Sequence, residues 1–202
     1  EDQILGQVHD AYLAAQAENA TDKIVSRLFQ RAFKVAKEVR TKTNINVGKV
    51  SVASVAVDLA VSIFDDLADK TVMVIGSGET GELALKTIFA QGVGNVIVVN
   101  RTLENARLLA AEYDGESFAL DQLESQLHRA DIIISSTAAP EPILDAADFG
   151  SALKKRSKDP MFVIDIAVPR DIHANVNDVD NVYLYDMDNL KAATEANLEA
   201  RR

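Results

Sequence analysis

Two different spacings of hydrophobic residues divide this chain of 202 residues near position 70. Before Thr71, apolar side chains recur every three or four positions, which is the spacing of amphipathic helices. After Thr71, short β-branched runs alternate with amphipathic stretches, which is typical of a parallel sheet covered on both faces. The pattern predicts an α/β fold, a doubly wound Rossmann-like parallel sheet preceded by an all-helical segment.

The segment before residue 69 is expected to contain helices and no strand. Its apolar residues form two stripes at helical spacing, Ile4, Val8, Tyr12 and Ala15 in the first and Ile24, Leu28, Ala32, Val35 and Val39 in the second. A break at 44–49 contains Gly48, and Ser51 is predicted to cap a third helix that carries Val52, Val55, Leu59 and Ile63. The stretch 51–66 could pack with the helices before it or with the sheet after it.

Strands and helices are expected to alternate after residue 70. The strands are predicted at 71–76, 95–99, 116–119, 131–135, 161–166 and 182–185. The helices are predicted at 79–91, 103–113, 120–128, 146–155 and 187–201. Right-handed crossovers would join these strands into one sheet, with a ligand at the carboxyl ends of the strands.

A glycine-rich turn directly follows the first predicted strand and consists of Gly76, Ser77, Gly78, Glu79, Thr80 and Gly81. We expect Gly76 to permit a tight turn, Gly78 to let main-chain amides approach a pyrophosphate, and Gly81 to let the next helix pack closely. The N–H groups at the start of that helix would then face the phosphates. Such a turn is a weak signal alone, but its place between a strand and a helix favours a dinucleotide site over a turn that merely packs.

The second predicted strand is closed by Asn100, Arg101 and Thr102. An acidic residue at this place would bind the ribose 2′-hydroxyl of NAD. An arginine with two small hydrogen-bonding residues suits a 2′-phosphate instead, so the sequence predicts NADPH as the cofactor. A surface arginine without this role is the alternative.

Two further strand ends belong to the same predicted rim. Ser136, Thr137 and Ala138 follow the fourth strand and are assigned to cofactor binding, because small residues leave room and offer hydroxyl and amide groups; an ordinary loop is the alternative. The fifth strand is followed by a loop that contains Asp165, Arg170 and Asp171. An ion pair between arginine and aspartate that shapes this loop is expected, with direct contact to nicotinamide or substrate as the alternative.

Composition and charge exclude several classes of protein. The net charge of −10 argues against a general nucleic-acid binder, and no apolar stretch is long enough to span a bilayer. The absence of cysteine excludes disulfides and thiolate zinc sites within these residues. The three histidines show no ligand spacing, so no metal site is predicted.

Basic residues gather between Lys23 and Lys49. A solvated helix face is the favoured interpretation of this run, and contact with an RNA backbone is the alternative.

Seven segments of the chain, in order and nearly from end to end, resemble the glutamyl-tRNA reductase family. They are 1–8, 27–33, 51–54, 76–81, 100–102, 135–140 and 165–171. The opening octet and the stretch Asp165–Asp171 are more specific than the glycine turn. The resemblance implies NADPH-dependent reduction of glutamyl-tRNA to glutamate-1-semialdehyde, the first committed step of tetrapyrrole (porphyrin) biosynthesis, in the cytoplasm.

The resemblance also implies how the chain relates to a whole enzyme. Residues 1–50 would be the helical C-terminal part of the catalytic domain, 51–186 the NADPH-binding Rossmann domain, and 187–202 the truncated start of the connecting (spinal) helix. In the family a cysteine of the catalytic domain attacks the glutamyl ester, and NADPH then reduces the thioester. No cysteine is present here, so we expect no catalytic residue in this chain and no turnover of glutamyl-tRNA by these residues alone.

Substrate and partners follow from the resemblance alone. Glu1, Asp2, Gln3 and Gln7 would border the glutamyl group, whereas their sequence context by itself suggests only the polar start of a helix. The full-length enzyme is expected to be a homodimer, with glutamate-1-semialdehyde aminomutase as a candidate partner. The apolar stripes of residues 1–68 are expected to be partly exposed without their neighbours.

Two other functions compete with this one. A shikimate-dehydrogenase-like NADPH oxidoreductase would share the glycine turn and the Asn-Arg-Thr ending, but the purely helical sequence before Thr71 speaks against it. The other is a non-catalytic dinucleotide-binding module.

Overall fold

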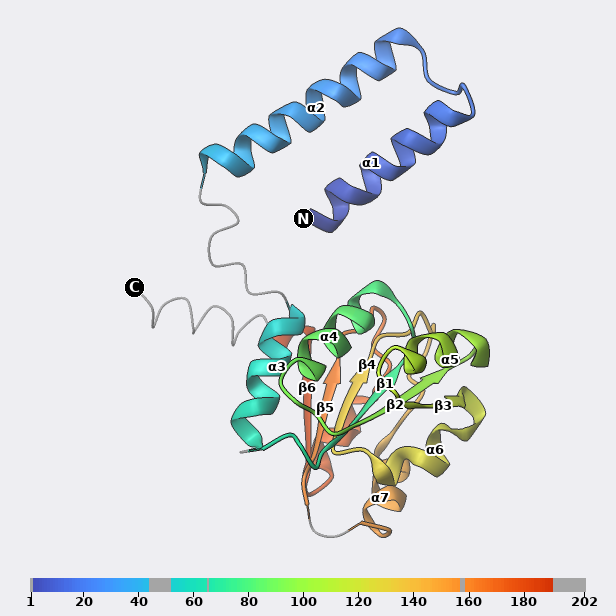
Figure 1. The fold of residues 1–202 in the computed structure, drawn as a ribbon. Helices are drawn as coiled ribbons and strands as arrows, with labels where there is room; N and C mark the ends of the chain where they lie inside the picture. Colours follow the sequence, from blue (N-terminus) through green and yellow to red (C-terminus); the bar gives the residue numbers. More distant parts are fainter. Residues whose placement is uncertain (1, 44–51, 65, 157–158, 191–202) are drawn as a thin grey trace. The chain divides into compact units, whose positions relative to one another are not determined.

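The computed structural model describes residues 2–43, 52–64, 66–156 and 159–190 of the chain (Figure 1). The chain divides into two compact units, Glu1–Lys49 and Val50–Arg202, each with its own packing. The assignment of 1–50, 51–186 and 187–202 to named parts of a larger enzyme stays a prediction.

The first unit is a pair of helices, α1 (Asp2–Ala17) and α2 (Lys23–Lys42). α2 begins at Lys23 because the carboxylate of Asp22 accepts a hydrogen bond from the N–H of Val25 at 2.7 Å. The ring of Tyr12 packs against the rings of Phe29 and Phe33, with centroid distances of 5.2 and 5.8 Å. This aromatic contact, with Tyr12 only 6% exposed, holds α1 and α2 together.

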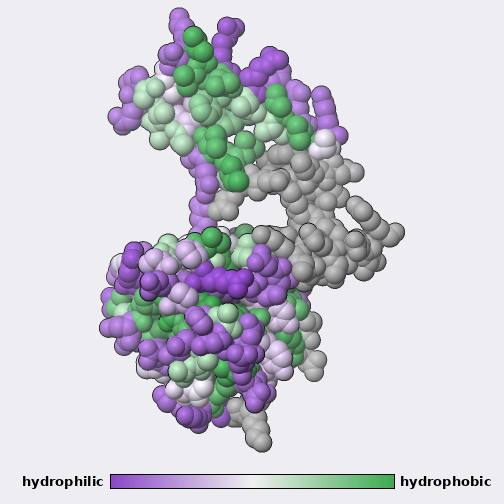
Figure 2. All heavy atoms as spheres, turned by 180° about the vertical axis from the view of Figure 1, so that it is seen from behind, coloured by the Kyte–Doolittle hydropathy of each residue, from purple (hydrophilic) through white to green (hydrophobic). Residues whose placement is uncertain are grey.

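Most members of the two predicted apolar stripes lie on the surface of this unit. Ile24 is 77% exposed and Leu28 is 66% exposed, and Figure 2 shows hydrophobic side chains gathered along the helical pair. α2 turns Phe29 and Phe33 toward α1, so the stripe that begins at Ile24 faces another direction. The partial exposure expected of these stripes is therefore present within this unit.

The second unit is built on a six-stranded parallel sheet in the order β3-β2-β1-β4-β5-β6. The strands are β1 (Thr71–Ile75), β2 (Asn95–Asn100), β3 (Glu116–Ala119), β4 (Ile132–Ser135), β5 (Met161–Asp165) and β6 (Val182–Asp186). All six predicted strands are present. The order reverses between β1 and β4, which makes the carboxyl edge there the topological switch point.

Alternating residues of the strands fill two hydrophobic cores, one on each face of the sheet. In β1, Val72 and Val74 belong to one core and Met73 and Ile75 to the other. The first face is covered by α3 (Val52–Ile63), α4 (Glu79–Phe89) and α5 (Leu103–Ala111). The second face is covered by α6 (Leu123–Gln126), α7 (Ala146–Leu153) and the 3-10 helix Ala174–Asp178 (Figure 1). The predicted doubly wound α/β fold is thus confirmed.

The structure decides two points that the pattern left open or simplified. α3 packs with the sheet, because Val55 and Ala60 are buried in the first core. The helix predicted over 120–128 is divided into a 3-10 turn at Leu120–Gln122, the short α6 and a second 3-10 turn at Leu127–Arg129.

Some predictions fall where the structure gives no description. The break at 44–49 and the Ser51 cap lie outside the described residues, as does most of the helix predicted at 187–201, of which 187–190 is helical. Among the described helices, none is long and apolar enough to cross a membrane.

Candidate dinucleotide site

The glycine-rich turn connects β1 to α4 at the switch point of the sheet. Gly76 has a φ of +92°, and a Cβ there would lie 2.8 Å from the carbonyl oxygen of Ser136. A Cβ on Gly81 would collide with the side chain of Ser136. Gly76 therefore requires glycine for its backbone conformation and for the close main chain of Ser136, whereas a side chain at Gly81 would force the Ser136 side chain to move.

Gly78 differs from these two glycines. A Cβ at Gly78 would meet only the carbonyl oxygen of Ser136, at an ordinary distance of 3.6 Å, so packing within the protein does not demand glycine here. Gly78 is also the N-cap of α4 and offers no side chain to the first N–H groups of the helix. Glu79, which is exposed, and Thr80 follow in the first turn of α4. The space over Gly78 and the helix start without a capping side chain at Gly78 fit a phosphate group.

Asn100, Arg101 and Thr102 lie beside this turn, because β2 pairs in parallel with β1. The side-chain amide of Asn100 donates a hydrogen bond of 2.7 Å to the hydroxyl of Ser77, which joins the two motifs. Arg101 and Thr102 are exposed, and the Thr102 hydroxyl makes no cap hydrogen bond to α5. A cation, a hydroxyl and an uncapped helix start are thus open to solvent at one place.

Ser136, Thr137 and Ala138 lie on the other side of the glycine turn, because β4 is the second neighbour of β1. The N–H of Ser136 donates a hydrogen bond of 2.9 Å to the carbonyl oxygen of Ile75. The Ser136 hydroxyl is buried and has no hydrogen-bond partner among the described residues. The Ser136 N–H is thus bonded to β1 and its carbonyl oxygen packs against Gly76, whereas Ala138 is exposed.

The loop after β5 differs from its prediction. Arg170 does form an ion pair, but with Asp186 at 2.8 Å and Asp188 at 3.4 Å, and not with Asp165 or Asp171. The reason is the sheet order, since β6 lies beside β5 and places Asp186 opposite Asp165. The expected loop-shaping ion pair is therefore correct in kind and wrong in its partner.

Asp165 and Asp171 are both buried at this edge of the sheet. Burial, with the neighbouring Asp171 carboxylate as a smaller cause, raises the pKa of Asp165, while hydrogen bonds from main-chain amides such as Ile172 oppose this rise. Asp171 accepts hydrogen bonds from Ser135 and Thr137, which lie more than thirty residues earlier. The sequence placed Asp171 at the rim but gave no indication of these contacts. A signal was available in the apolar neighbours Ile164 and Ile172, which mark both carboxylates as buried.

Three of the four predicted substrate-side residues, Asp2, Gln3 and Gln7, belong to α1. Glu1 lies outside the described residues, as do the side chains of Asp2 and Gln3, and Gln7 is exposed. Their role stays a prediction.

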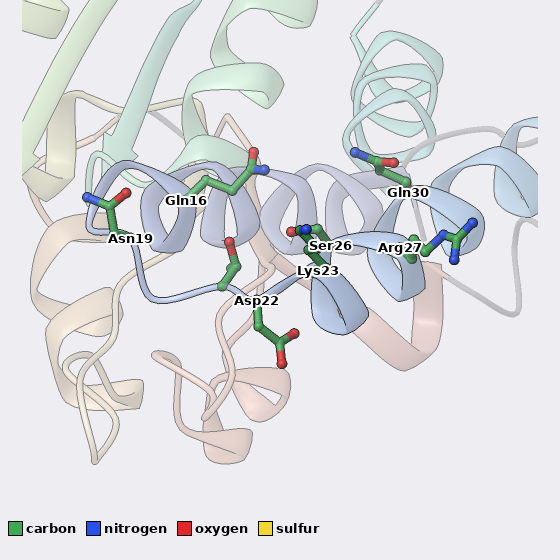
Figure 3. A pocket seen from close by; sticks show the side chains of 8 residues that line it. Gln16, Asn19, Asp22, Lys23, Ser26, Arg27 and Gln30 are labelled. Carbon is green, nitrogen blue, oxygen red and sulfur yellow. The ribbon is translucent and has the colours of Figure 1, made fainter.

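A polar depression of about 540 Å³ lies at the turn between α1 and α2 (Figure 3). It is lined by Gln16, Asn19, Thr21, Asp22, Lys23, Ser26, Arg27 and Gln30. Figure 3 shows these side chains spread around the turn rather than converging on one point. The basic residues that follow along α2, including Arg31 and Lys34, are exposed as well, which is compatible with either interpretation of the basic run.

The geometry defines a class of protein. The described residues contain no group of His, Cys, Asp or Glu that could hold a metal ion. A six-stranded doubly wound sheet carries a glycine turn, a helix start without a capping side chain at Gly78 and an exposed arginine at its switch point. The chain thus has the doubly wound α/β fold of the dinucleotide-binding class of proteins.

Comparisons with known proteins narrow this class. Residues 58–193 match the family described as Shikimate / quinate 5-dehydrogenase, and residues 1–43 match the Glutamyl-tRNAGlu reductase N-terminal domain. The chain is 50% identical to glutamyl-tRNA reductase of Geotalea daltonii over 202 residues, which is 100% of this chain and 46% of that protein. It spans about half the length of the curated relatives it matches.

Solved structures agree with this result. Glutamyl-tRNA reductase from Methanopyrus kandleri superimposes with a TM-score of 0.71 at 40% identity, covering 100% of this chain and 51% of that one. The nucleotide binding domain of glutamyl-tRNA reductase from Thermoplasma volcanium has a TM-score of 0.54 at 20% identity, covering 76% of this chain and 97% of that one, and supports the fold alone. The chain belongs to the glutamyl-tRNA reductase family, and its residues 58–193 carry the domain shared with the shikimate and quinate dehydrogenases.

Proposed function

We propose that this chain is the NADPH-binding part of an enzyme that reduces glutamyl-tRNA to glutamate-1-semialdehyde in tetrapyrrole biosynthesis. The observation that carries the proposal is the exposed Arg101 at the end of β2, next to the glycine turn between β1 and α4. A dianionic 2′-phosphate on the adenosine ribose would accept charge-assisted hydrogen bonds from this guanidinium. Thr102 offers a hydroxyl at the same place, and Asn100 is held by Ser77.

The remaining predicted residues would bind and orient the cofactor. The amides around Gly78 would hold the pyrophosphate, and the segment Ser136–Ala138 would line the other half of the dinucleotide. NADPH supplies a hydride when bound. The cysteine nucleophile would come from another part of the whole protein, because these 202 residues contain none. Glutamyl-tRNA as substrate, an aminomutase partner, a homodimer and a cytoplasmic location belong to this proposal.

A shikimate-dehydrogenase-like activity is the second candidate, because residues 58–193 match that family. The match of residues 1–43 to the N-terminal domain of glutamyl-tRNA reductase favours the first candidate. Incubation of the chain with shikimate and NADP should give no NADPH absorbance. The other alternative, a non-catalytic dinucleotide-binding module, is tested by the full reading frame of the gene. A frame that encodes no cysteine nucleophile would favour this module.

Cofactor choice is the direct test of the proposal. We expect calorimetric titration to show tighter binding of NADPH than of NADH. Arg101→Ala should weaken NADPH binding by about 10- to 100-fold, the value of one charge-assisted contact, and leave NADH binding unchanged.

Arg107 on α5 provides the matched control. It is exposed and forms a weak ion pair with Glu104 at 3.6 Å, so Arg107→Ala removes the same charge from the helix that begins just after Arg101. It should not change the preference for NADPH. Equal loss of NADPH and NADH binding in Arg101→Ala, or no loss of either, would refute the assignment.

A further inference from the structure

Asp171 connects two parts of the site that are far apart in the sequence. Its Oδ2 accepts hydrogen bonds from the Ser135 hydroxyl at 2.7 Å and from the Thr137 N–H at 2.8 Å, and its Oδ1 accepts one from the Thr137 hydroxyl. Asp171 is fully buried, so these bonds form without competition from water. Three donors of one short segment are thus directed at one carboxylate.

The segment held by Asp171 is the wall against which the glycine turn packs. Ser136 stands between the two residues that Asp171 binds, and its carbonyl oxygen lies 2.8 Å from where a Cβ of Gly76 would be. Its side chain occupies the place of a Cβ on Gly81. A shift of this segment would therefore change the crevice on the β4 side of the glycine turn.

The main chain of Asp171 is itself fixed. Its carbonyl oxygen accepts hydrogen bonds from the N–H of Ile143 at 2.7 Å and of Leu144 at 3.3 Å. The N–H of the next residue, Ile172, donates to Asp165 at 2.9 Å. These hydrogen bonds hold Asp171 in place, so its carboxylate can position the segment after β4.

This segment lies on one particular half of the site. The strand order is β2-β1-β4, so Arg101 and the Ser135–Thr137 segment lie on opposite sides of the glycine turn. In a doubly wound fold the dinucleotide crosses the crevice at this point, with its adenosine end toward β2. The segment after β4 would then face the nicotinamide half.

We infer that Asp171 is a positioning residue for the nicotinamide half of the cofactor: it holds Ser135 and Thr137 so that the segment between them shapes that half of the crevice. The inference rests on the proposed function, because it needs a dinucleotide at the switch point. Asp171 touches no cofactor atom itself and acts through the segment that it binds.

The test compares a whole dinucleotide with its adenosine half. NADPH and adenosine 2′,5′-bisphosphate are titrated into the 202-residue chain by calorimetry. Asp171→Ala should weaken NADPH binding by about tenfold or more, because the freed segment must be ordered on binding, and change bisphosphate binding by less than about twofold. Arg101→Ala should weaken both ligands, which separates the two halves of the site.

The conservative variant Asp171→Asn should restore NADPH binding to within about threefold. The amide oxygen can accept from Ser135 and from the Thr137 N–H, and the amide nitrogen can donate to the Thr137 hydroxyl, which reverses its direction. Ser135→Ala removes one of the three donors to Asp171 and should give a smaller loss of NADPH binding. This variant replaces Asp171→Ala in the test if Asp171→Ala does not fold.

Val176→Ala is the control for stability alone. Val176 is a buried side chain on the same face of the sheet and takes no part in the hydrogen bonds of Asp171. Val176→Ala should lower the melting temperature without changing the affinity for NADPH or for adenosine 2′,5′-bisphosphate. The inference is overturned if folded Asp171→Ala binds NADPH normally, if both ligands weaken equally, or if Asp171→Asn behaves like Asp171→Ala. If the unaltered chain binds neither ligand, the proposed function fails and this inference fails with it.

Discussion

The carboxylate of Asp165 is buried, and burial disfavours its charged form. It is 1% exposed at the end of β5, beside the second buried carboxylate Asp171. Its Oδ1 and Oδ2 accept the N–H groups of Ala167 and Ile172 at 3.1 and 2.9 Å, which shapes the loop after the strand. Desolvation outweighs these hydrogen bonds, and the pKa of Asp165 is raised.

A raised pKa gives Asp165 a defined effect on stability against pH. The folded state binds the Asp165 proton more tightly than the unfolded state, so this group lowers stability as pH rises from its ordinary pKa through its folded pKa. Acidification through the same window therefore adds stability from this residue. Melting temperatures of the unaltered chain and of Asp165→Asn are measured from pH 7 down to about pH 4. The melting temperature of the unaltered chain should rise relative to that of Asp165→Asn as the pH falls. A difference that shrinks on acidification would show that the pKa is lowered instead.

At the scale of elements, Arg156 ties the end of α7 to the starts of two strands. Its guanidinium donates to the carbonyl oxygens of His128 and Ala130 at 3.0 and 2.7 Å and to Oδ1 of Asp131 at 2.7 Å. Oδ2 of Asp131 accepts the N–H of Thr71, the first residue of β1, at 2.9 Å. The Arg156 side chain is only 7% exposed, so this ion pair is largely removed from water.

Breaking this contact should destabilise the second unit strongly. Arg156→Ala leaves the mostly buried Asp131 carboxylate without its cation and two carbonyl oxygens without this donor, and we expect a loss of about 3–5 kcal/mol in urea unfolding. Arg156→Lys keeps the charge but cannot bind all three acceptors, so its loss should be intermediate. Arg107→Ala, at an exposed ion pair, should cost less than about 1 kcal/mol. A similar small loss for Arg156→Ala would mean that the contact does not hold these elements together.

The regular elements of the second unit follow closely from the hydrophobic pattern. The strand that contains Val72 and Val74 and the strand that contains Ile132 and Ile134 were predicted within one residue of their bounds. Their apolar runs are buried on both faces, so period and length identify them locally. The division of 120–128 into 3-10 and α turns could not be predicted, because Leu123 and Leu127 take that geometry to fit a core formed by distant strands.

At the scale of the whole molecule, the two units differ in how much they bury. In the described part of Glu1–Lys49, Tyr12 is the one side chain that counts as buried core. Val50–Arg202 has two cores, one on each face of its sheet. Burial of apolar surface is the main source of stability, so the helical unit should open far more easily than the sheet unit.

Hydrogen exchange on the whole chain measures this difference. Amides of α1 and α2 should exchange at least about a hundredfold faster than those of β1, β4 and β5. α4 is the matched control, because it is also a helix but buries Ala84, Leu85 and Ile88 against the sheet. Its amides should be protected like those of the strands. Equal protection of α2 and α4 would show that the helical unit is stabilised by contacts beyond the aromatic cluster around Tyr12.

The sequence by itself determined most elements of the second unit and which residue types stand at three strand ends. A β-branched run, a glycine at a turn and an arginine after a strand act within a few residues, so their consequences can be predicted locally. The tertiary structure alone decided which distant groups meet: Asp171 with Ser135 and Thr137, Arg170 with Asp186, and Arg156 with Asp131. These pairs depend on strand order and on burial, and a polar group removed from water must bind whatever partner the fold brings within reach.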